Sequence, residues 1–479
     1  MSQSSTDVVR ERDSLRDEMA HGDLGDARLN ARRNQLMTML ERTPDAGFPE
    51  ACGNGSETEA LYRFLRNRRV SLGAILEPHL EATGARCRAL DDVVVIHDTT
   101  EMAFPGEQKR TGLTPLGPRR QGFWFHVALA VSAEGLRAPL GLIAVAPFTR
   151  PAIGGVKPSW RERFRDPRKE SRRWADGVTA VRGRVSEPAR AIHVMDREGD
   201  SYELFAALTA HGDRCVVRVR YDRQIVSAET TEPTRLSDAR AQVAVLVERE
   251  VTVAPRRAED RAQRLAHPAR DGRVATVSFA ACHVVLQRPR DHRSSPLPAT
   301  VAVNVVFGWE AQPPPGETPV EWWLVTTEPI DTIEHVLQIV EWYRTRWLIE
   351  EFFKCLKTGC AYEKRQLESL DTLLVALALL APIAWQLLLM RHLARELPET
   401  SATVALTARQ IAILRITPVG TKLLATPSIR DALLAVARLG GHLRQNGEPG
   451  WLVLARGMQK LLCMETGWAA AEAARCDQS

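Results

Sequence analysis

No two cysteines in this sequence are separated by two residues, and the eight that are present are scattered between Cys52 and Cys476. The usual ligand spacing of a structural zinc site is therefore missing, which argues against a zinc module. The first residues are too rich in charge for an export signal. Scattered cysteines without such a signal fit a reducing cytoplasm, where we expect the protein to be located.

Long apolar runs are also scarce. One run, Leu373–Met390, contains Pro382 and Gln386, and it is shorter than the roughly 20 apolar residues of a membrane-spanning helix. We expect it to form a buried core helix, with no membrane partner. Internal repeats and long low-complexity tracts are missing as well.

The chain has 479 residues, 44% of them hydrophobic, and a formal net charge of +5. That length suits two to four domains with a large core, and the composition excludes wholesale disorder. The charge is only mildly basic. Local clusters of arginine and lysine therefore say more about a nucleic-acid partner than the total charge does.

Four polar residues share one face of a helix predicted over residues 331–359, which Asp331 or Thr332 could cap and Gly359 could end. These residues are Tyr343, Arg346, Glu350 and Lys357. Their intervals of three, four and seven residues place them on one side of an α-helix. Glu351 projects about 100° away from that side, so Glu350 is the candidate carboxylate. An ordinary solvated helix surface is the competing interpretation.

Two aspartates follow short β-branched runs upstream. Asp98 is predicted at the end of a buried strand that contains Val93–Ile96, and Asp196 at the end of one that contains Ile192–Met195. A helix is predicted to begin near Ser201. A carboxylate at the end of a buried strand is well placed to hold a metal, although an aspartate that opens a turn gives the same local pattern.

The surrounding segments predict a sheet. Phe123–Val131 and Pro139–Ala146 predict a hairpin, which gives three adjacent strands together with the strand before the first aspartate. His126 on the middle strand is predicted to be a core or rim histidine rather than a ligand. Asp213–Arg223 predicts a further strand, on which Arg218 could meet a phosphate.

Residues 1–75 predict a helical unit with a basic surface. Ser56 and Glu59 form a candidate capping box, and Arg33 is expected on the exposed side of the preceding helix. The candidate phosphate contacts are Arg28, Arg32, Arg63 and Arg66. A solvated cationic surface is the alternative to phosphate contact.

Residues 224–330 are rich in β-branched runs and predict an inserted β-rich subdomain. Its closing strand carries Trp322 and Trp323, which must face opposite sides, and core packing is the alternative role for either ring. Residues 365–479 predict amphipathic helices. Their apolar faces fit intrachain packing as well as contact with a second subunit.

In order and spacing, these motifs resemble the insertion-sequence-four family of bacterial DDE transposases, which has a Tyr-Arg-Glu-Lys helix. The resemblance extends to the Asp-Thr-Thr at Asp98 and to the Asp-Arg-Glu-Gly-Asp at Asp196, where Gly199 replaces an alanine of the family. It also includes the basic loop around Lys169 and the stretch Tyr62–Asn67.

The resemblance implies a catalytic and metal-binding set of Asp98, Asp196 and Glu350, with two Mg²⁺ ions that Mn²⁺ can replace. It implies that Trp322 receives a flipped base. The implied DNA contacts are Tyr343, Arg346, Trp347, Lys357, Trp322, Arg218, Lys169, Arg28, Arg32, Tyr62, Arg63 and Arg66.

The fold implied by this resemblance is an α/β, RNase H-like catalytic core with a β-rich insertion and helical domains at both ends. The implied domains are an end-binding domain (1–75), a catalytic domain (76–223 and 331–385), the insertion (224–330) and a dimerisation domain (386–479). We expect deletion of residues 1–70 to abolish end binding and to leave a folded remainder.

The implied activity is cut-and-paste transposition by a homodimer on double-stranded transposon-end DNA and target DNA. Two alternatives are a DNA-binding regulator of the same fold that no longer transposes, and a phosphodiesterase with another substrate. The intact acidic set argues against the first alternative, and the extended cationic surface argues against the second.

Overall fold

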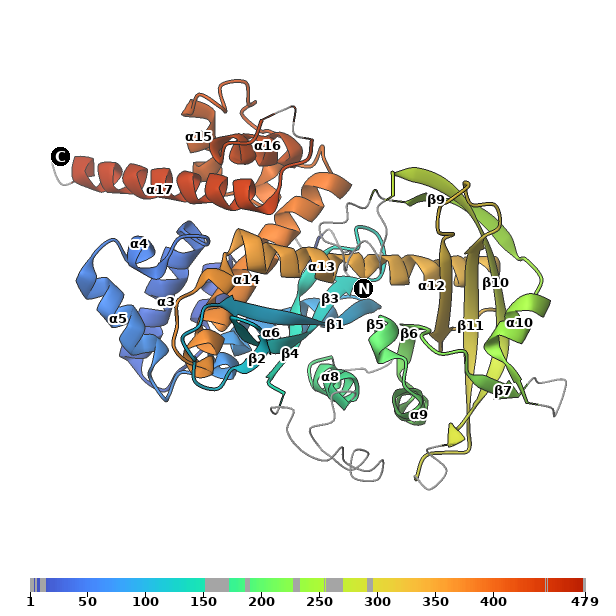
Figure 1. The fold of residues 1–479 in the computed structure, drawn as a ribbon. Helices are drawn as coiled ribbons and strands as arrows, with labels where there is room; N and C mark the ends of the chain where they lie inside the picture. The colour runs from blue at the N-terminus through green and yellow to red at the C-terminus, as the bar shows by residue number, and fades with distance from the viewer. Residues whose placement is uncertain are drawn as a thin grey trace. The chain divides into compact units, whose positions relative to one another are not determined.

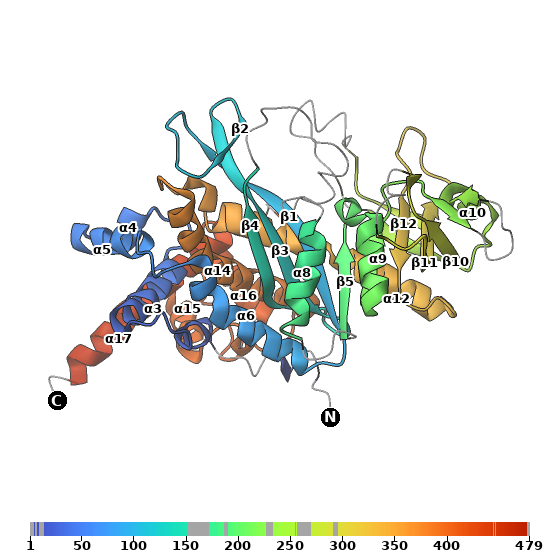
Figure 2. The same cartoon turned by 90° about the horizontal axis from the view of Figure 1, so that it is seen from below.

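The structure is a computed structural model of the chain (Figure 1; Figure 2). It describes residues 4, 7–8, 14–150, 172–185, 190–226, 233–253, 255, 270–290, 296–443, 445 and 447–476. The chain divides into two compact units, which are considered separately below. The first unit consists of Met1–Val156, Thr179–Ser186 and Trp347–Ser479, and the second of Lys157–Val178 and Glu187–Arg346.

The sheet of the first unit consists of β1 (Val93–Pro105), β2 (Thr114–Gly117), β3 (Arg120–Ser132) and β4 (Pro139–Phe148). Strands β1, β2 and β4 all pair antiparallel to β3, which confirms the predicted hairpin and its neighbouring strand. His126 is buried on β3 and its Nδ1 lies 2.9 Å from the hydroxyl of Thr99. It is therefore a core histidine with a hydrogen-bond partner, as predicted.

Strand β1 does not end at Asp98, so the predicted position at a strand end is wrong. The strand runs for 13 residues, and Asp98 pairs with Val127 near the middle of the register. Burial is what changes at this point, because Val93–His97 are buried whereas Asp98 is half-exposed. The β-branched run indicated only the buried part of β1. The more polar residues that follow remain in the strand because they also pair with β3.

The helices before the sheet are α2 (Leu15–Ala20), α3 (Ala27–Arg42), α4 (Phe48–Cys52), α5 (Gly55–Leu65) and α6 (Leu72–Arg88). The prediction of Ser56 as a cap is wrong, because Asn54 caps α5 and its Oδ1 accepts the N–H of Glu57 at 2.8 Å. Asparagine caps a helix as well as serine does. Helix α6 has no counterpart in the sequence prediction.

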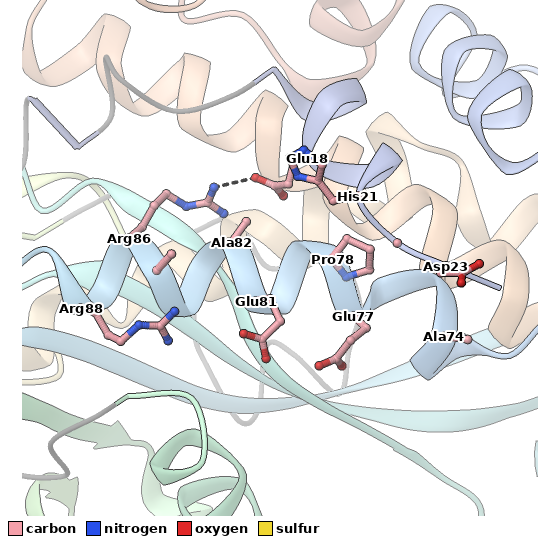
Figure 3. Close-up of a pocket in the computed structure, with 12 residues that line it drawn as sticks. Glu18, His21, Asp23, Ala74, Glu77, Pro78, Glu81, Ala82, Arg86 and Arg88 are labelled. Carbon is pink, nitrogen blue, oxygen red and sulfur yellow. Dashed lines mark hydrogen bonds and ion pairs between the residues drawn. The ribbon is translucent and has the colours of Figure 1, made fainter. Parts of the chain in front are cut away.

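A buried polar network joins α2 to α6. Arg86 donates to Oε2 of Glu18 at 2.6 Å (Figure 3), and Nδ1 of His79 lies 2.5 Å from the other oxygen of Glu18. The Nε2 of His79 accepts the N–H of Leu142 at 3.1 Å, so His79 is neutral and its Nδ1–H donates to Glu18. Arg86 also donates to the carbonyl oxygen of Leu140 at 2.7 Å. Loss of one charged partner would leave the other buried without compensation.

A second buried cation joins the turn after α3 to a segment near residue 360. Arg365 donates to the carbonyl oxygens of Pro44, Ala46 and Cys360, and its guanidinium lies 4.7 Å from the ring centroid of Phe48. The N-terminal helices therefore share buried charges with the rest of the first unit. This geometry argues against the expectation that residues 1–70 can be removed from a folded remainder.

Acid is expected to weaken the first unit through Glu18. Burial would raise the pKa of this carboxyl, but His79 and Arg86 lower it from 4.5 to about 2. At a pH above about 4.5, the pKa of Glu18 in the unfolded chain, the ionised carboxyl therefore stabilises the folded state. This stabilisation is lost as the pH falls from about 4.5 towards 2. The loss reaches about 2 kcal/mol near pH 3. The free energy of unfolding in urea, measured between about pH 7 and pH 3, should show this loss in the wild type and not in Glu18→Gln. An equal pH dependence in the two proteins would contradict the prediction.

The first unit ends with α14 (Leu370–Glu396), α15 (Ala408–Ile416), α16 (Ile429–Leu439) and α17 (Trp451–Cys476). Helix α14 is long and apolar enough to cross a membrane, but 89% of its most apolar window is buried inside the protein. It packs against α6 and β4, and Trp385 donates from Nε1 to the carbonyl oxygen of Pro139 at 2.9 Å. These contacts confirm the predicted core helix.

The strands of the second unit are β5 (Ala191–Met195), β6 (Arg214–Arg218), β7 (Gln224–Val226), β8 (Pro233–Arg235), β9 (Val247–Val253), β10 (Arg273–Gln287), β11 (Thr300–Glu310) and β12 (Glu321–Thr326). Strands β5 and β6 are parallel. Antiparallel pairing continues from β6 through β12, β11, β10 and β7 to β8, and β9 pairs with β10. This arrangement confirms that residues 224–330 are rich in strands.

Helix α9 (Tyr202–His211) covers the sheet of the second unit. The helix begins beside Ser201, as predicted, and Ser201 is its N-cap. Phe205 packs in one core with Phe307 of β11. The unit also contains α10 (Leu236–Gln242) and α12 (Ile333–Thr345). Together these elements place the end of β5, and therefore Asp196, beside the end of β6.

The helix predicted over residues 331–359 is interrupted. Thr332 caps α12, as predicted, and its hydroxyl accepts the N–H of His335 at 3.2 Å. Arg346 ends α12, and α13 (Trp347–Lys354) follows in the first unit. A π-helical segment, η4 (Cys355–Gly359), then replaces the predicted α-helical turn.

Candidate active site and nucleic-acid interface

Asp98 and Glu350 belong to the first unit. Asp98 is half-buried on β1, and its Oδ1 accepts the N–H of Thr99 at 2.7 Å. Glu350 is half-buried in the first turn of α13, and α13 packs against β1. Two of the predicted carboxylates therefore lie on elements that are in direct contact.

Glu351 has a structural role. Its Oε1 lies 3.4 Å from Nζ of Lys354, and its Oε2 accepts a hydrogen bond from Arg391 of α14 at 3.0 Å. Both oxygens are thus in ion pairs, and the side chain is buried. The choice of Glu350 over Glu351 as the catalytic carboxylate stays a prediction.

Lys357 extends from η4 to β1. Its Nζ donates to the carbonyl oxygen of Glu101 at 2.5 Å and lies 3.5 Å from Oε1 of Glu363. That oxygen of Glu363 also accepts the N–H of Ala103 at 2.9 Å. Lys357 is therefore held beside the strand that carries Asp98. Glu363 was not a predicted site residue, because no motif spacing includes it.

Asp196 belongs to the second unit and directly follows β5, as predicted. Its Oδ1 accepts the N–H of Glu198 at 2.8 Å and caps the short 3-10 helix η2, Arg197–Gly199. A Cβ atom at Gly199 would lie 2.8 Å from Cβ of Met195. Glycine therefore suits this turn, because an alanine would force Met195 to shift.

A cluster of polar side chains surrounds the end of β5. Burial lowers the pKa of the Arg197 guanidinium, and the charge of Arg218 lowers it further, while Tyr343 and Glu321 act in the opposite direction. Arg218 donates to the carbonyl oxygen of Glu321 at 3.0 Å. The predicted phosphate contact Arg218 thus lies at the same end of the sheet as Asp196. Tyr343 is buried and acts on the charge of Arg197.

The two tryptophans of β12 face opposite sides, as predicted. Trp323 meets the ring of Phe307 edge-on at 5.5 Å and packs against the core below α9. Trp322 stacks on Phe279 at 6.3 Å between ring centroids and pairs with Gly308 of β11. Since Trp323 has a clear packing role, Trp322 remains the candidate for an aromatic contact with DNA.

The predicted basic surface of the N-terminal helices is only partly available. Arg28 is exposed, but Arg32 pairs with Glu57 at 2.5 Å. The predicted exposure of Arg33 is wrong, because this side chain is fully buried and donates to the carbonyl oxygen of Gly22 at 2.8 Å. Tertiary contact with the end of α2 overrides the helical phase at this position.

The arginines at the C-terminal end of α5 point outward. The side chains of Arg63 and Arg66 are 70% and 63% exposed, and their only charged partners in the described chain are surface carboxylates. The guanidinium of Arg66 lies 6.0 Å from the ring centroid of the half-buried Tyr62. Trp347 is 52% exposed at the start of α13. Lys169 lies outside the described residues.

The acidic residues suit a hard divalent cation by their chemistry, since Mg²⁺ prefers carboxylate oxygen. Asp196 uses one oxygen to cap η2 and has no hydrogen bond to the other from the described residues. The three carboxylates are divided between the two units. Among the described residues, no group of three or more His, Cys, Asp or Glu side chains forms a metal site.

A groove of about 740 Å³ lies beside α6 in the first unit (Figure 3). Its acidic lining includes Glu77 and Glu81, which both accept hydrogen bonds from Arg184. None of the predicted catalytic or DNA-contacting residues lines this groove. It is therefore separate from the candidate site.

Two known families match the sequence. Residues 11–70 match the family described as transposase DNA-binding, and residues 171–385 match the family described as transposase DDE domain. The second match contains Asp196 and Glu350, whereas Asp98 precedes it. A DNA-binding region followed by a DDE domain defines the class of protein as a DNA transposase. The chain is a DDE transposase, built as a mixed α/β protein.

A solved structure was also compared with the chain. The piggyBac transposase in a synaptic complex with hairpin DNA aligns with 82% of this chain and 69% of its own, at 10% identity and a TM-score of 0.34. Similarity at that score does not establish a common fold. The assignment to the transposases therefore depends on the two family matches.

Proposed function

We propose that this transposase works by cut-and-paste transposition, with an RNase H-like core and the Tyr-Arg-Glu-Lys helix of the insertion-sequence-four family. The observation that carries the proposal is the placement of Glu350 on a helix packed against the strand of Asp98, in a chain with a DDE domain. Asp196 would complete the acidic set when the two units act together on DNA.

Asp98, Asp196 and Glu350 are the residues that would hold two Mg²⁺ ions, for which Mn²⁺ could substitute. Such ions supply an activated water and cancel charge on the phosphate. Glu351 would not join them, because Lys354 and Arg391 occupy both of its oxygens. The protein itself must place the phosphodiester bond, which is the task of the neighbouring cations.

The DNA contacts divide by unit. In the first unit, Arg28, Arg63 and Arg66 are proposed to bind the phosphates of double-stranded transposon-end DNA, and Lys357 binds a phosphate beside Asp98. In the second unit, Tyr343 and Arg218 are proposed to bind a phosphate beside Asp196. Arginine grips a phosphate with two hydrogen bonds, whereas lysine acts as a point charge. Residues 386–479 are proposed to pair two subunits during end synapsis.

The proposal is tested on DNA from both sides of the gene. Purified protein is incubated with end fragments, with and without Mg²⁺ or Mn²⁺, and the products are resolved as nicked, hairpin and joined DNA. Nicks at one position in a terminal inverted repeat, followed by hairpins and joining to target DNA, are the expected products. Specific binding without any metal-dependent cleavage would instead indicate a regulator.

Replacing Trp322 is expected to affect hairpin formation more than the first nick. A hairpin needs a sharply bent strand, and unstacking a base costs a few kcal/mol, which stacking on an aromatic ring offsets by about 1–3 kcal/mol. Trp322→Ala should therefore slow hairpin formation on pre-nicked ends about tenfold or more, with a smaller effect on nicking. The neighbouring Trp323→Ala should instead reduce stability, because Trp323 packs on Phe307. Equal slowing of both steps by Trp322→Ala would show that Trp322 has only a packing role.

A further inference from the structure

In the segment after β5, one basic side chain forms no hydrogen bond or ion pair with the described residues. Glu198 pairs with Arg173 at 2.8 Å. Asp200 is buried and accepts two hydrogen bonds from Arg223, from Nε at 2.9 Å and from Nη2 at 2.6 Å. Arg197 lies between them, and its exposed side chain makes no hydrogen bond or ion pair with any residue that the structure describes. The charges of Glu321 and Asp196 act on it only from a distance. No direct contact in the described fold therefore accounts for the positive charge at this position.

The position of Arg197 is defined by the sheet. Strands β5 and β6 are parallel, and Met195 pairs with Val217. Arg197 follows Met195 by two residues and Arg218 follows Val217 by one, so both cations emerge at the same end of neighbouring strands. Arg218 is itself held by the carbonyl oxygen of Glu321 at 3.0 Å. Two cations that lie close together repel each other, and a bound anion relieves that repulsion.

We propose that Arg197 binds a backbone phosphate of the end DNA together with Arg218, next to the phosphodiester bond served by Asp196. This inference rests on the proposed function, since it assumes that end DNA reaches Asp196. Arg197 is the residue after Asp196, so the phosphate that it grips lies adjacent to the bond that is cut. Arg197 is thus a positioning residue, and it acts on the DNA backbone without reading its sequence.

The test pairs a protein substitution with a neutral phosphate. End DNA is prepared with a single methylphosphonate at each of the phosphates around the cleavage position, and nicking by the wild type and by Arg197→Gln is measured. On ordinary DNA, Arg197→Gln should nick about tenfold to a hundredfold more slowly, as expected for loss of a charged hydrogen bond. At one phosphate, the methylphosphonate should slow the wild type by a similar factor and leave Arg197→Gln unchanged.

Two further variants separate positioning from folding. Arg197→Lys keeps the charge without the two-hydrogen-bond grip and should fall between the wild type and Arg197→Gln. Arg249→Gln removes an exposed arginine of the same unit that lies 3.7 Å from Glu341, and it should nick like the wild type at every methylphosphonate position. All variants should share the thermal midpoint of the wild type.

The outcomes distinguish this inference from the proposed function. If the wild type binds ends but does not cut them, the proposed function fails. The same four combinations of protein and DNA are then compared by their dissociation constants. The contact is supported if, at one phosphate, the loss caused by Arg197→Gln and the loss caused by the methylphosphonate do not add. This criterion applies to nicking rates and to dissociation constants alike. Wild-type nicking by Arg197→Gln, or additive losses at every phosphate, would overturn it.

Discussion

Glu350→Gln is expected to abolish metal-dependent nicking, whereas Glu351→Gln should keep it. Loss of a metal-holding carboxylate removes several kcal/mol of transition-state stabilisation, which corresponds to a rate loss of about a thousandfold or more. Glu350 is half-buried and is not part of the ion pairs that Glu351 forms with Lys354 and Arg391. Nicking rates at saturating protein, together with thermal melting of each variant, measure the difference.

The adjacent pair provides its own control. Glu351→Gln should lower the thermal midpoint, because removing one partner of a buried ion pair costs about 3–5 kcal/mol. Glu350→Gln should remain folded, so that its nicking rate can be measured. If Glu350→Gln cuts at the wild-type rate, Glu350 is not in the catalytic site. If Glu351→Gln remains folded but is inactive, the assignment of the two carboxylates must be reversed.

Deletion of residues 1–70 is expected to unfold the first unit. The deletion removes Glu18 and the carbonyl oxygens of Pro44 and Ala46, so that Arg86 and Arg365 would remain buried without these partners. A buried charge without its partner costs about 3–5 kcal/mol, and a whole domain is stable by only about 5–15 kcal/mol. Circular dichroism and limited proteolysis of the truncated protein should show a disordered product.

A pair of point variants tests the same interaction in the intact chain. Glu18→Gln should lower the free energy of unfolding by about 3–5 kcal/mol. Glu57→Gln breaks the surface pair with Arg32, in which Glu57 is 50% exposed, and should cost less than about 1 kcal/mol. A folded, cooperatively melting truncation, or equal effects of the two variants, would show that the buried network does not hold α2 in place.

The sequence predicted well those features that depend on local order. The β-branched run before Asp196 correctly predicted β5, and Ser201 correctly marked the start of α9. Helical phase separated Glu350 from Glu351, because neighbouring residues on a helix point about 100° apart. These features need no knowledge of what packs on the element.

The features that the sequence could not predict depend on tertiary contacts. Arg33 has the helical phase of an exposed residue, yet carbonyl groups at the end of α2 bind its guanidinium. Asp98 continues a strand because β3 pairs with it on both sides of that residue. Lys357 lies on a π-helical turn, a geometry that no residue interval indicates. Two partners of Arg365, the carbonyl oxygens of Pro44 and Ala46, are more than 300 residues away in the chain, beyond the reach of any motif.

The buried network of Glu18, His79 and Arg86 also limits how the protein can be recombined. A chimera that took its end-binding region from a relative and joined it near residue 75 would separate Glu18 from Arg86, which compensates its charge, and from His79, which donates a hydrogen bond to it. A junction placed after Arg88, where α6 ends, keeps these partners on one donor sequence. Exchange of end specificity between transposases of this kind should therefore succeed with a junction after Arg88. It should fail with a junction near residue 75, unless the partners of Glu18 are exchanged together with it.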